Sequence, residues 1–378
     1  MLINSLSLKN FKCFEELDVK FAPITLLTGA NSSGKSSLIN AILAVLQTRG
    51  FPYYLSLNGS YVSMGSFEDI IYGRDASKKL ELQIKIQDQY ILTTRWESDS
   101  HEQANFSGLE YKDEKFTTDG PNIQTGEFGW KHDIINSAID PEKIFFELTV
   151  GQDRFDFNYI SSFRLSPERT YYRQSGADFK IMKTGELYID QIIEWEDNSS
   201  AKFQDLTNIL QKLELVQSIK SSILKGGRFE LNVKVHKASQ AISLVDVGFG
   251  ISQFLPIIVA DLQLSDKSCL AISQPEIHLH PKIQAQFGNY LASQVNQTEK
   301  QYIVETHSEY LLNRIRLLLV TGELKPNQVR VLYFENDGIK STKHDIEFAT
   351  DGQIKGAPQG FFDTYGIDVM DIAMNAHE

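Results

Sequence analysis

Cysteine is scarce in this chain, which has only two among its 378 residues, Cys13 and Cys269. Two cysteines so far apart do not make the disulfide framework of a small secreted protein, and they fit a reducing compartment. The first residues, MLINSLSLKNFKCF, also lack the apolar core of a signal peptide. We therefore expect a cytoplasmic protein.

Long hydrophobic runs and an excess of positive charge are missing too. The apolar stretch from Leu255 to Leu264 is interrupted by Pro256 and Asp261, so it is too short and too polar to span a bilayer. Lysine and arginine number 37 against 49 acidic residues, which gives a formal net charge of −12. This balance disfavours general coating of DNA or anionic membranes, and we expect no membrane partner.

One local exception to the acidic balance lies between residues 220 and 237. Glu230 is the only acid in this stretch. Its cations are Lys220, Lys225, Arg228, Lys234 and Lys237. Two interpretations stay open here: a solvated face of a helix or strand, or a local groove for nucleic acid.

Apolar residues are plentiful, at 42% of the chain, and their spacing predicts an α/β fold. Alternation near the N-terminus predicts a hairpin of two strands, and residues 24–28 form a short apolar run that ends at Gly29. Helical spacing begins at Ser36. Strand, glycine loop and helix therefore follow one another directly.

Further along, short β-like runs between residues 52 and 160 predict an antiparallel β-layer, which includes KIFFELTV and RFDFNYI. The polar stretch 99–124 predicts a loop within it. Helical periodicity over 186–225 predicts a short helical insertion. From residue 229 strands and helices alternate, and a polar tail is expected after residue 335.

The glycine loop has the spacing GxxxxGK[ST]. Its glycines let successive N–H groups point inward at phosphate oxygens, and the helix that follows adds a favourable dipole. Lys35 places a cation near the β- and γ-phosphates, and the hydroxyl of Ser36 is the expected Mg²⁺ ligand. The predicted nucleotide-binding residues are Gly29, Asn31, Ser32, Ser33, Gly34, Lys35, Ser36 and Ser37.

Three downstream segments accompany this loop. VGFGISQ (247–253) opens an apolar helical pattern, QPEIHLHP (274–281) follows an apolar strand, and THS (306–308) follows another. Together with GANSSGKSS they resemble the ABC-type ATPase heads of SMC and RecF proteins, over nearly the whole chain. The resemblance is closest to the compact bacterial AAA-labelled branch with a PEIHLHP segment, which includes the overcoming-lysogenisation-defect ATPases and the PtuA ATPases of Septu defence systems.

This resemblance implies an α/β, P-loop ABC-ATPase head with a mixed, mainly parallel core sheet, an antiparallel β-layer and a short helical lid. It implies an N-terminal ATPase lobe over 1–175, a helical lid over 176–228 and a C-terminal lobe over 229–378. ATP and Mg²⁺ are the implied cofactors. A homodimer or larger even-numbered oligomer is the implied assembly, because such heads close around nucleotide head to tail.

The resemblance also implies roles for individual residues. Gly248, Gly250, Ser252 and Gln253 correspond to the signature motif, which would meet the γ-phosphate held by the other subunit. His307 corresponds to the switch histidine that senses this phosphate.

The chain departs from the pattern at two positions. Ser273 stands where an acid that positions Mg²⁺ is usual, and Gln274 where a glutamate usually polarises water. An amide can orient water but is a poor base, so we expect tight ATP binding with slow hydrolysis. Glu276 is the nearest carboxylate, and it is either a substitute for that base or a structural acid.

Two other groups have competing interpretations. Glu276, His278 and His280 alternate and could hold a metal, although their position favours packing and loop-fixing roles. The segment from Arg164 to Tyr172 is either a structural turn or a contact to nucleotide, partner or nucleic acid.

We therefore expect a regulatory ATPase that closes on ATP as a dimer. By similarity to Septu-like systems, it would control a separate nuclease in anti-phage defence, since the tail after Phe334 is too short for a fused nuclease. The alternative is a RecF-like clamp in DNA repair or chromosome maintenance, which binds duplex DNA through residues 220–237. A transporter subunit fits the PEIHLHP segment poorly.

Overall fold

The structure is a computed structural model, which describes residues 2–48, 51, 54–86, 90–98, 103–111, 114–117, 156–172, 180–358, 361 and 374. These residues form two compact units. Unit 1 takes residues 1–21, 36–156 and 336–342. Unit 2 takes residues 22–35, 157–335 and 343–378. Each unit is described by itself below.

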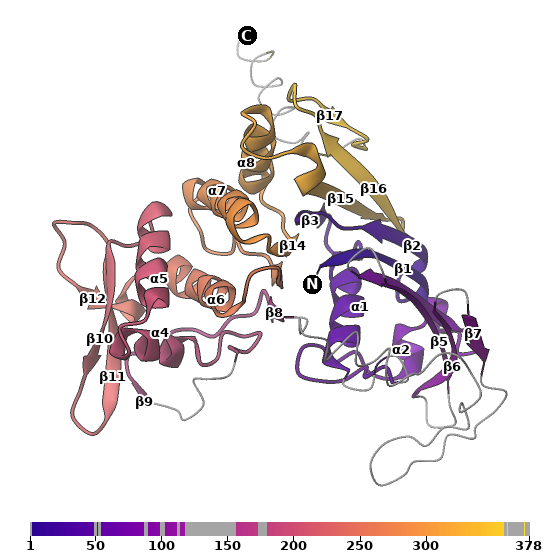
Figure 1. The fold of residues 1–378 in the computed structure, drawn as a ribbon, viewed down its shortest axis with the longest axis horizontal. Coiled ribbons are helices and arrows are strands. Elements are labelled where there is room, and N and C mark those ends of the chain that lie inside the picture. The colour runs from indigo at the N-terminus through magenta and orange to yellow at the C-terminus, as the bar shows by residue number, and fades with distance from the viewer. Residues whose placement is uncertain are drawn as a thin grey trace. The chain divides into compact units, whose positions relative to one another are not determined.

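Unit 1 is built on a six-stranded antiparallel sheet with the order β2-β1-β4-β5-β6-β7. Its strands are β1 (Ile3–Phe11), β2 (Phe14–Lys20), β4 (Leu80–Ile86), β5 (Tyr90–Ser98), β6 (Ala104–Tyr111) and β7 (Glu114–Thr117). Apolar residues alternate with polar ones, as in LELQIKI of β4, so one face of the sheet is buried. The unit's helical segments are α1 (Lys35–Gln47), which begins at the last residue of a unit 2 segment, α2 (Phe67–Ile70) and the 3₁₀ turn η1 (Tyr72–Arg74). Figure 1 shows these strands in indigo and purple.

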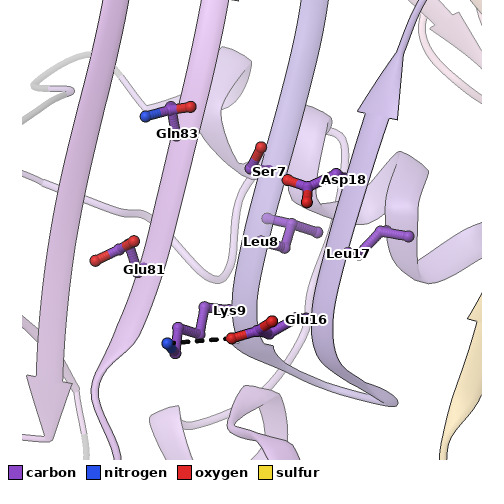
Figure 2. Close-up of a pocket in the computed structure, with 8 residues that line it drawn as sticks. All are labelled: Ser7, Leu8, Lys9, Glu16, Leu17, Asp18, Glu81 and Gln83. Carbon is purple, nitrogen blue, oxygen red and sulfur yellow. Dashed lines mark ion pairs between the residues drawn. The ribbon is translucent and has the colours of Figure 1, made fainter.

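The polar face of this sheet carries a hollow of about 280 Å³. Figure 2 shows its lining on three neighbouring strands: Ser7, Leu8 and Lys9 of β1, Glu16, Leu17 and Asp18 of β2, and Glu81 and Gln83 of β4. Lys9 pairs with Glu16 at 3.2 Å, and Arg95 lies 2.6 Å from Glu81. Charges paired in this way across exposed strands are typical of a solvated sheet face.

Unit 2 is built on a seven-stranded sheet with the order β17-β16-β15-β3-β14-β13-β8. Its strands are β3 (Ile24–Gly29), β8 (Phe157–Ile160), β13 (Cys269–Ser273), β14 (Gln301–Glu305), β15 (Val329–Asn336), β16 (Ser341–Phe348) and β17 (Ile354–Lys355). From β15 to β8 all neighbours run parallel. Every residue of β3, β13 and β14 is buried, as expected for central strands of a parallel sheet covered on both faces.

Helices of unit 2 share one hydrophobic core with this sheet and with a smaller four-stranded sheet. The helices are α4 (Tyr188–Asp197), α5 (Ala201–Lys212), α6 (Phe249–Gln263), α7 (Pro281–Thr298) and α8 (Glu309–Val320), with 3₁₀ turns η3 (Leu244–Asp246) and η4 (Pro326–Gln328). The smaller sheet contains β9 (Tyr171–Tyr172), β10 (Ser218–Ile223), β11 (Arg228–Lys234) and β12 (Ile242–Ser243). Among the described residues, no helix combines the length and apolar character needed to cross a membrane.

Local sequence explains where the helices nearest the sheet's carboxyl edge begin. His280 caps α7 and is followed by Pro281, whose missing N–H is harmless in the first turn. The Ser308 hydroxyl caps α8 by accepting a hydrogen bond from Leu311 N at 3.0 Å. Each helix therefore begins at the end of the short segment that follows β13 or β14.

Several sequence expectations are confirmed, and four are corrected. RFDFNYI contributes β8 to the parallel core sheet and not to the antiparallel layer, because it pairs with β13. Residues 104–111 and 114–117 are strands within the expected loop, since they extend the sheet beyond β5. Residues 218–223 form a strand and not the end of a helix, and the expected tail contains strand β16.

The lobes expected at 1–175, 176–228 and 229–378 stay a prediction, and the two compact units divide the chain in another way. The early strand β3 belongs to unit 2, because it pairs with β14 and β15. The KIFFELTV run at 143–150 lies outside the described residues.

A buried polar cluster holds α6, α7 and β14 together. The carboxylate of Asp261 is fully buried and accepts hydrogen bonds from the hydroxyls of Tyr290 and Tyr302. Lys300 Nζ lies 3.3 Å from Asp261 Oδ1 and donates to Asp261 O at 2.7 Å. Burial raises the pKa of both tyrosines well above its usual value, with the Asp261 charge acting in the same direction, so their hydroxyls stay protonated donors.

This cluster predicts that Lys300→Met destabilises the protein by about 3 kcal/mol, because it leaves a buried carboxylate without its cation. Denaturant unfolding measures the loss. Lys267→Met is the matched control, since Lys267 and Glu299 form an exposed pair whose loss costs less than about 1 kcal/mol. Equal shifts for the two variants would contradict a stabilising role of the buried pair.

Candidate functional site

The glycine loop has the strand–loop–helix setting that the sequence predicts. It connects β3 to α1, and three of its residues have positive φ: Gly29 at 131°, Ser32 at 61° and Gly34 at 107°. A Cβ atom on Gly29 would lie 2.1 Å from Phe334 O of β15, so no larger residue fits there. Alternation of left- and right-handed backbone turns successive N–H groups toward one side, which makes a concavity for an anion.

Lys35 closes this loop from the inside. Its side chain is almost fully buried, and Nζ donates to Gly29 O at 2.9 Å and Ala30 O at 2.6 Å. Burial lowers the pKa of the ammonium, while the negative charges of Glu305 and Glu276 act in the opposite direction. The loop therefore holds a cation in a partly dehydrated position, where its attraction to a phosphate is strong.

Ser33 supplies a second sign of an anion site. Its Oγ is buried and has no hydrogen-bond partner in the described part of the chain. A buried hydroxyl without a partner costs about 1–3 kcal/mol of stability. A phosphate oxygen that accepts a hydrogen bond from this hydroxyl would remove that cost. Asn31, Ser32 and Ser36 are exposed, and Ser37 Oγ accepts a hydrogen bond from Cys13 Sγ at 3.7 Å. The residues present thus fit a triphosphate.

The sheet places a buried carboxylate that sequence reasoning missed. Strand β14 lies between β3 and β13, and its last residue, Glu305, pairs with Leu27 on one side and Ser273 on the other. Glu305 is 6% exposed, and its Oε2 accepts a hydrogen bond from Ser273 Oγ at 3.0 Å. The hydroxyl of Tyr159 lies 3.2 Å from the same Oγ. Only the register of the parallel strands brings Glu305 here.

Arg164 anchors the turn that follows β13. Its guanidinium is 5% exposed and donates four hydrogen bonds of 2.7–3.3 Å to backbone oxygens of Ser161, Gln253, Ser273 and Gln274. Burial lowers the pKa of Arg164 to about 10, against the opposing charges of Glu276 and Tyr159. Arg164 has a structural role here, since it ties the carboxyl end of β13 to helix α6.

Gln274 stands in a backbone conformation unusual for its residue type, with φ at 49°. Its N–H donates to Glu305 O at 2.7 Å, and its carbonyl oxygen accepts from Arg164, so both peptide groups of the turn are held. A residue held in this region needs support from its surroundings, and such residues gather at functional sites.

Both carboxylate oxygens of Glu276 accept hydrogen bonds from the segment that follows β14. Oε1 accepts from His307 N at 2.7 Å, and Oε2 accepts from Thr306 Oγ1 at 2.9 Å. Of the two roles that the sequence left open, this geometry favours the structural one, since Glu276 holds the Thr306–His307 segment.

His307 presents its side chain to solvent at the same edge. Burial and the Lys35 charge lower the pKa of its imidazole, while Glu276 and Glu305 act in the opposite direction. The ring is therefore neutral at pH 7 and can accept or donate a hydrogen bond. Lys35, Glu276, Glu305 and His307 are close enough to influence one another electrostatically, so the structure gathers residues from three separate sequence segments.

The predicted signature segment forms the first turns of α6. Gly250 packs against the chain, since a Cβ there would lie 2.5 Å from His278 O. Ser252 is fully buried and donates to Phe249 O at 2.9 Å, while Gln253 Nε2 donates to Leu165 O at 3.1 Å. In a single chain these two side chains therefore turn inward, and Gly248 and Phe249 form the exposed start of the helix.

His278 and His280 each have a packing partner. The ring of His278 lies 5.7 Å from that of Phe249, and His280 Nδ1 accepts a hydrogen bond from Lys282 N at 3.2 Å. Among the described residues, no group of three or more His, Cys, Asp or Glu side chains is arranged to hold a metal. Their contacts are those of loop fixing and helix capping.

Known proteins with a similar sequence include an OLD protein. The chain is similar to the OLD nuclease of Thermus scotoductus, with 20% identity over 362 residues that cover 89% of this chain and 65% of the relative. It thus spans less than two thirds of that protein's length. A further family model, described as a protein of unknown function (DUF3696), matches residues 324–372.

Solved structures with a similar fold include heads of SMC proteins. The SMC head domain from Thermotoga maritima has a TM-score of 0.50 at 12% identity and covers 92% of this chain and all of its own. An SMC head bound to the C-terminal winged-helix domain of ScpA has a TM-score of 0.52 at 14% identity, over 91% of this chain and 97% of its own. At these identities the likeness shows the fold alone, that of an ABC-type ATPase head.

The model of the AAA ATPase domain matches residues 1–132 and 180–312, which together are well over half of the chain. These residues include the phosphate-binding loop, the signature segment and the PEIHLHP and THS segments described above. With the fold of an ABC-type head and the similarity to an OLD protein, the chain belongs to the AAA ATPase domain family.

Proposed function

We propose that this protein binds ATP with Mg²⁺ in the Gly29–Ser36 loop, hydrolyses it slowly, and uses the bound nucleotide to hold two copies together. The observation that carries the proposal is the loop itself. It combines a concavity of backbone N–H groups, the buried Lys35 ammonium and the unpartnered Ser33 hydroxyl. When bound, Mg²⁺ would bridge phosphate oxygens and neutralise charge, with Ser36 as its protein hydroxyl ligand.

Slow hydrolysis follows from the groups near the turn after β13. The side chain at the usual position of the base is an amide, Gln274, and Glu276 is occupied with Thr306 and His307. General-base catalysis contributes about 10²–10⁴-fold, so its absence slows turnover while leaving the binding of the triphosphate intact. Arg164 and Glu276 would keep Gln274 and His307 in place around the γ-phosphate.

Dimerisation is supported by the shape of the signature segment. The start of α6 is exposed at Gly248 and Phe249, and the N-terminus of a helix attracts an anion. In the proposed dimer this helix end would face the γ-phosphate bound by the other copy. Ser252 and Gln253 would then support the helix from within.

Control of a nuclease in anti-phage defence is the biological role we propose. The similarity to an OLD nuclease supports a link to nuclease chemistry, while the shared part is that of an ATPase. The effector would be a separate subunit whose activity depends on whether the heads are closed. Heads that hydrolyse slowly are suited to such a role, because the closed state then lasts long.

A specific observation favours a second candidate, an ATP-dependent clamp on duplex DNA. Strands β10 and β11 form a hairpin in which Lys220 pairs with Asn232 and Ser218 with Lys234. Arg228 is opposite Tyr172 of β9, which is 67% exposed. None of these cations has a carboxylate within ion-pair distance among the described residues. Unpaired cations beside an exposed aromatic suit a phosphate backbone.

Lys35→Ala is predicted to weaken ATP binding by about 100-fold or more, because a charge-assisted contact to phosphate is worth up to about 3 kcal/mol. Titration with a fluorescent ATP analogue measures the affinity. The exposed Lys267→Ala variant is the control and is expected to bind as the wild type does. Retained affinity in Lys35→Ala would remove the basis for placing the triphosphate in this loop.

Gln274→Glu is predicted to raise the single-turnover hydrolysis rate by about 10-fold or more, because it supplies the missing base. ATP affinity should stay within about threefold of wild type. Gln274→Leu, which can neither orient nor deprotonate water, should hydrolyse more slowly than the wild type. If Gln274→Glu binds ATP normally and gains no rate, the slow step is set by something other than this position.

The clamp is tested by duplex binding with the protein alone, followed by fluorescence anisotropy at several salt concentrations. Replacing Lys220, Arg228 and Lys234 with Gln should weaken ATP-dependent binding by about 10-fold or more and flatten its salt dependence. A control variant with Lys282, Lys325 and Lys340 replaced should bind as the wild type does. Duplex binding that depends neither on ATP nor on the hairpin cations would contradict the clamp hypothesis.

A further inference from the structure

A serine occupies the place of the metal-positioning acid at the end of β13, yet an acid stands one strand away. Ser273 of β13 and Glu305 of β14 are paired in register. Neighbouring strands lie about 4.8 Å apart, so a glutamate side chain on β14 reaches the space that a shorter acid on β13 would fill. On its other side Glu305 is paired with Leu27, two residues before the phosphate-binding loop begins.

The small side chain at 273 does more than leave room. Ser273 Oγ donates to Glu305 Oε2 at 3.0 Å, and the Tyr159 hydroxyl lies 3.2 Å from the same Oγ. A hydrogen bond from a hydroxyl to a carboxylate restricts the rotation of the carboxylate. Ser273 and Tyr159 therefore hold Glu305 in one orientation at the carboxyl edge of the sheet.

Charge and burial indicate what this carboxylate is for. Glu305 is 6% exposed, and burying an ionised carboxylate is costly unless a cation is near. Its charge acts on Lys35 more strongly than that of Glu276 does. Glu276 has both oxygens engaged by Thr306 and His307, so it is the less suitable of the two for a metal.

We propose that Glu305 is the acid of the Mg²⁺ site, moved from β13 to the adjacent strand β14. This inference rests on the proposed binding of ATP. Mg²⁺ in nucleotide sites is held by one or two carboxylates or hydroxyls together with phosphate oxygens and water. Glu305 provides the carboxylate, and Ser273 and Tyr159 are positioning residues that act through it.

The proposal is tested by measuring ATP affinity with Mg²⁺ and with EDTA, using a fluorescent ATP analogue. Glu305→Gln should reduce affinity in Mg²⁺ by about 10-fold or more, down to the level in EDTA, and leave the EDTA value unchanged. Glu276→Gln should keep most of the Mg²⁺ dependence. Electron paramagnetic resonance of Mn²⁺ with ATP gives a second readout that does not depend on hydrolysis. It should show Mn²⁺ binding lost only in Glu305→Gln.

A relocation of the acid separates a metal role from a structural one. The double variant Ser273→Asp with Glu305→Ser returns the acid to β13, and it should restore the Mg²⁺ dependence to within about threefold of wild type. Circular dichroism confirms folding. Glu305→Asp replaces the Gln variant if the latter does not fold, and should shift the Mn²⁺ spectrum.

Full Mg²⁺ dependence in a folded Glu305→Gln, or no rescue by the double variant, would overturn the proposal. Failure of the proposed function looks different, because the wild type would then bind no ATP with or without Mg²⁺.

Discussion

A buried ammonium at the carboxyl edge of a parallel sheet is the constraint that organises this protein. Lys35 lies in a loop that must curl tightly enough to give its Nζ two carbonyl partners, and the positive φ angles at Gly29, Ser32 and Gly34 allow that curl. The charge is stable there because carboxylates stand nearby, and strand order decides which ones. With β14 between β3 and β13, Glu305 lies on the strand directly beside that of the loop. A triphosphate can replace the loop carbonyls as the partner of Lys35.

Two side chains link this centre to the surfaces around it. Arg164 joins the turn at Gln274 to helix α6, and Glu276 joins the same turn to the segment that carries His307. Because both anchors are hydrogen-bonded to backbone, a shift of the turn moves the elements attached to it. In the proposed dimer, a change in which ligand occupies the loop would shift the exposed start of α6 through these contacts. Such a connection would let nucleotide govern whether two heads stay closed.

The sequence predicted the phosphate-binding loop, the α/β class and most core strands, because each depends on a local pattern: glycine spacing, alternation or a run of apolar residues. It did not predict Glu305, since no spacing along the chain relates residue 305 to residue 273, and only the register of β13 and β14 does. RFDFNYI was placed in the wrong sheet for the same reason, as strand periodicity does not reveal the partner strand. Ser252 was expected to face a ligand, yet helix packing turns it inward. Local sequence patterns do not reveal which strands pair or in which register, and these features decide where Glu305 and RFDFNYI lie.

The most direct measurement is a crystal structure of the protein with Mg²⁺ and a non-hydrolysable ATP analogue. The phosphates should lie in the Gly29–Ser36 loop, with Ser33 Oγ and Lys35 Nζ hydrogen-bonded to phosphate oxygens and Lys35 released from the carbonyls of Gly29 and Ala30. A structure in which the analogue binds elsewhere, while Lys35 keeps its bonds to those two carbonyls, would contradict the assignment of this loop as the nucleotide site.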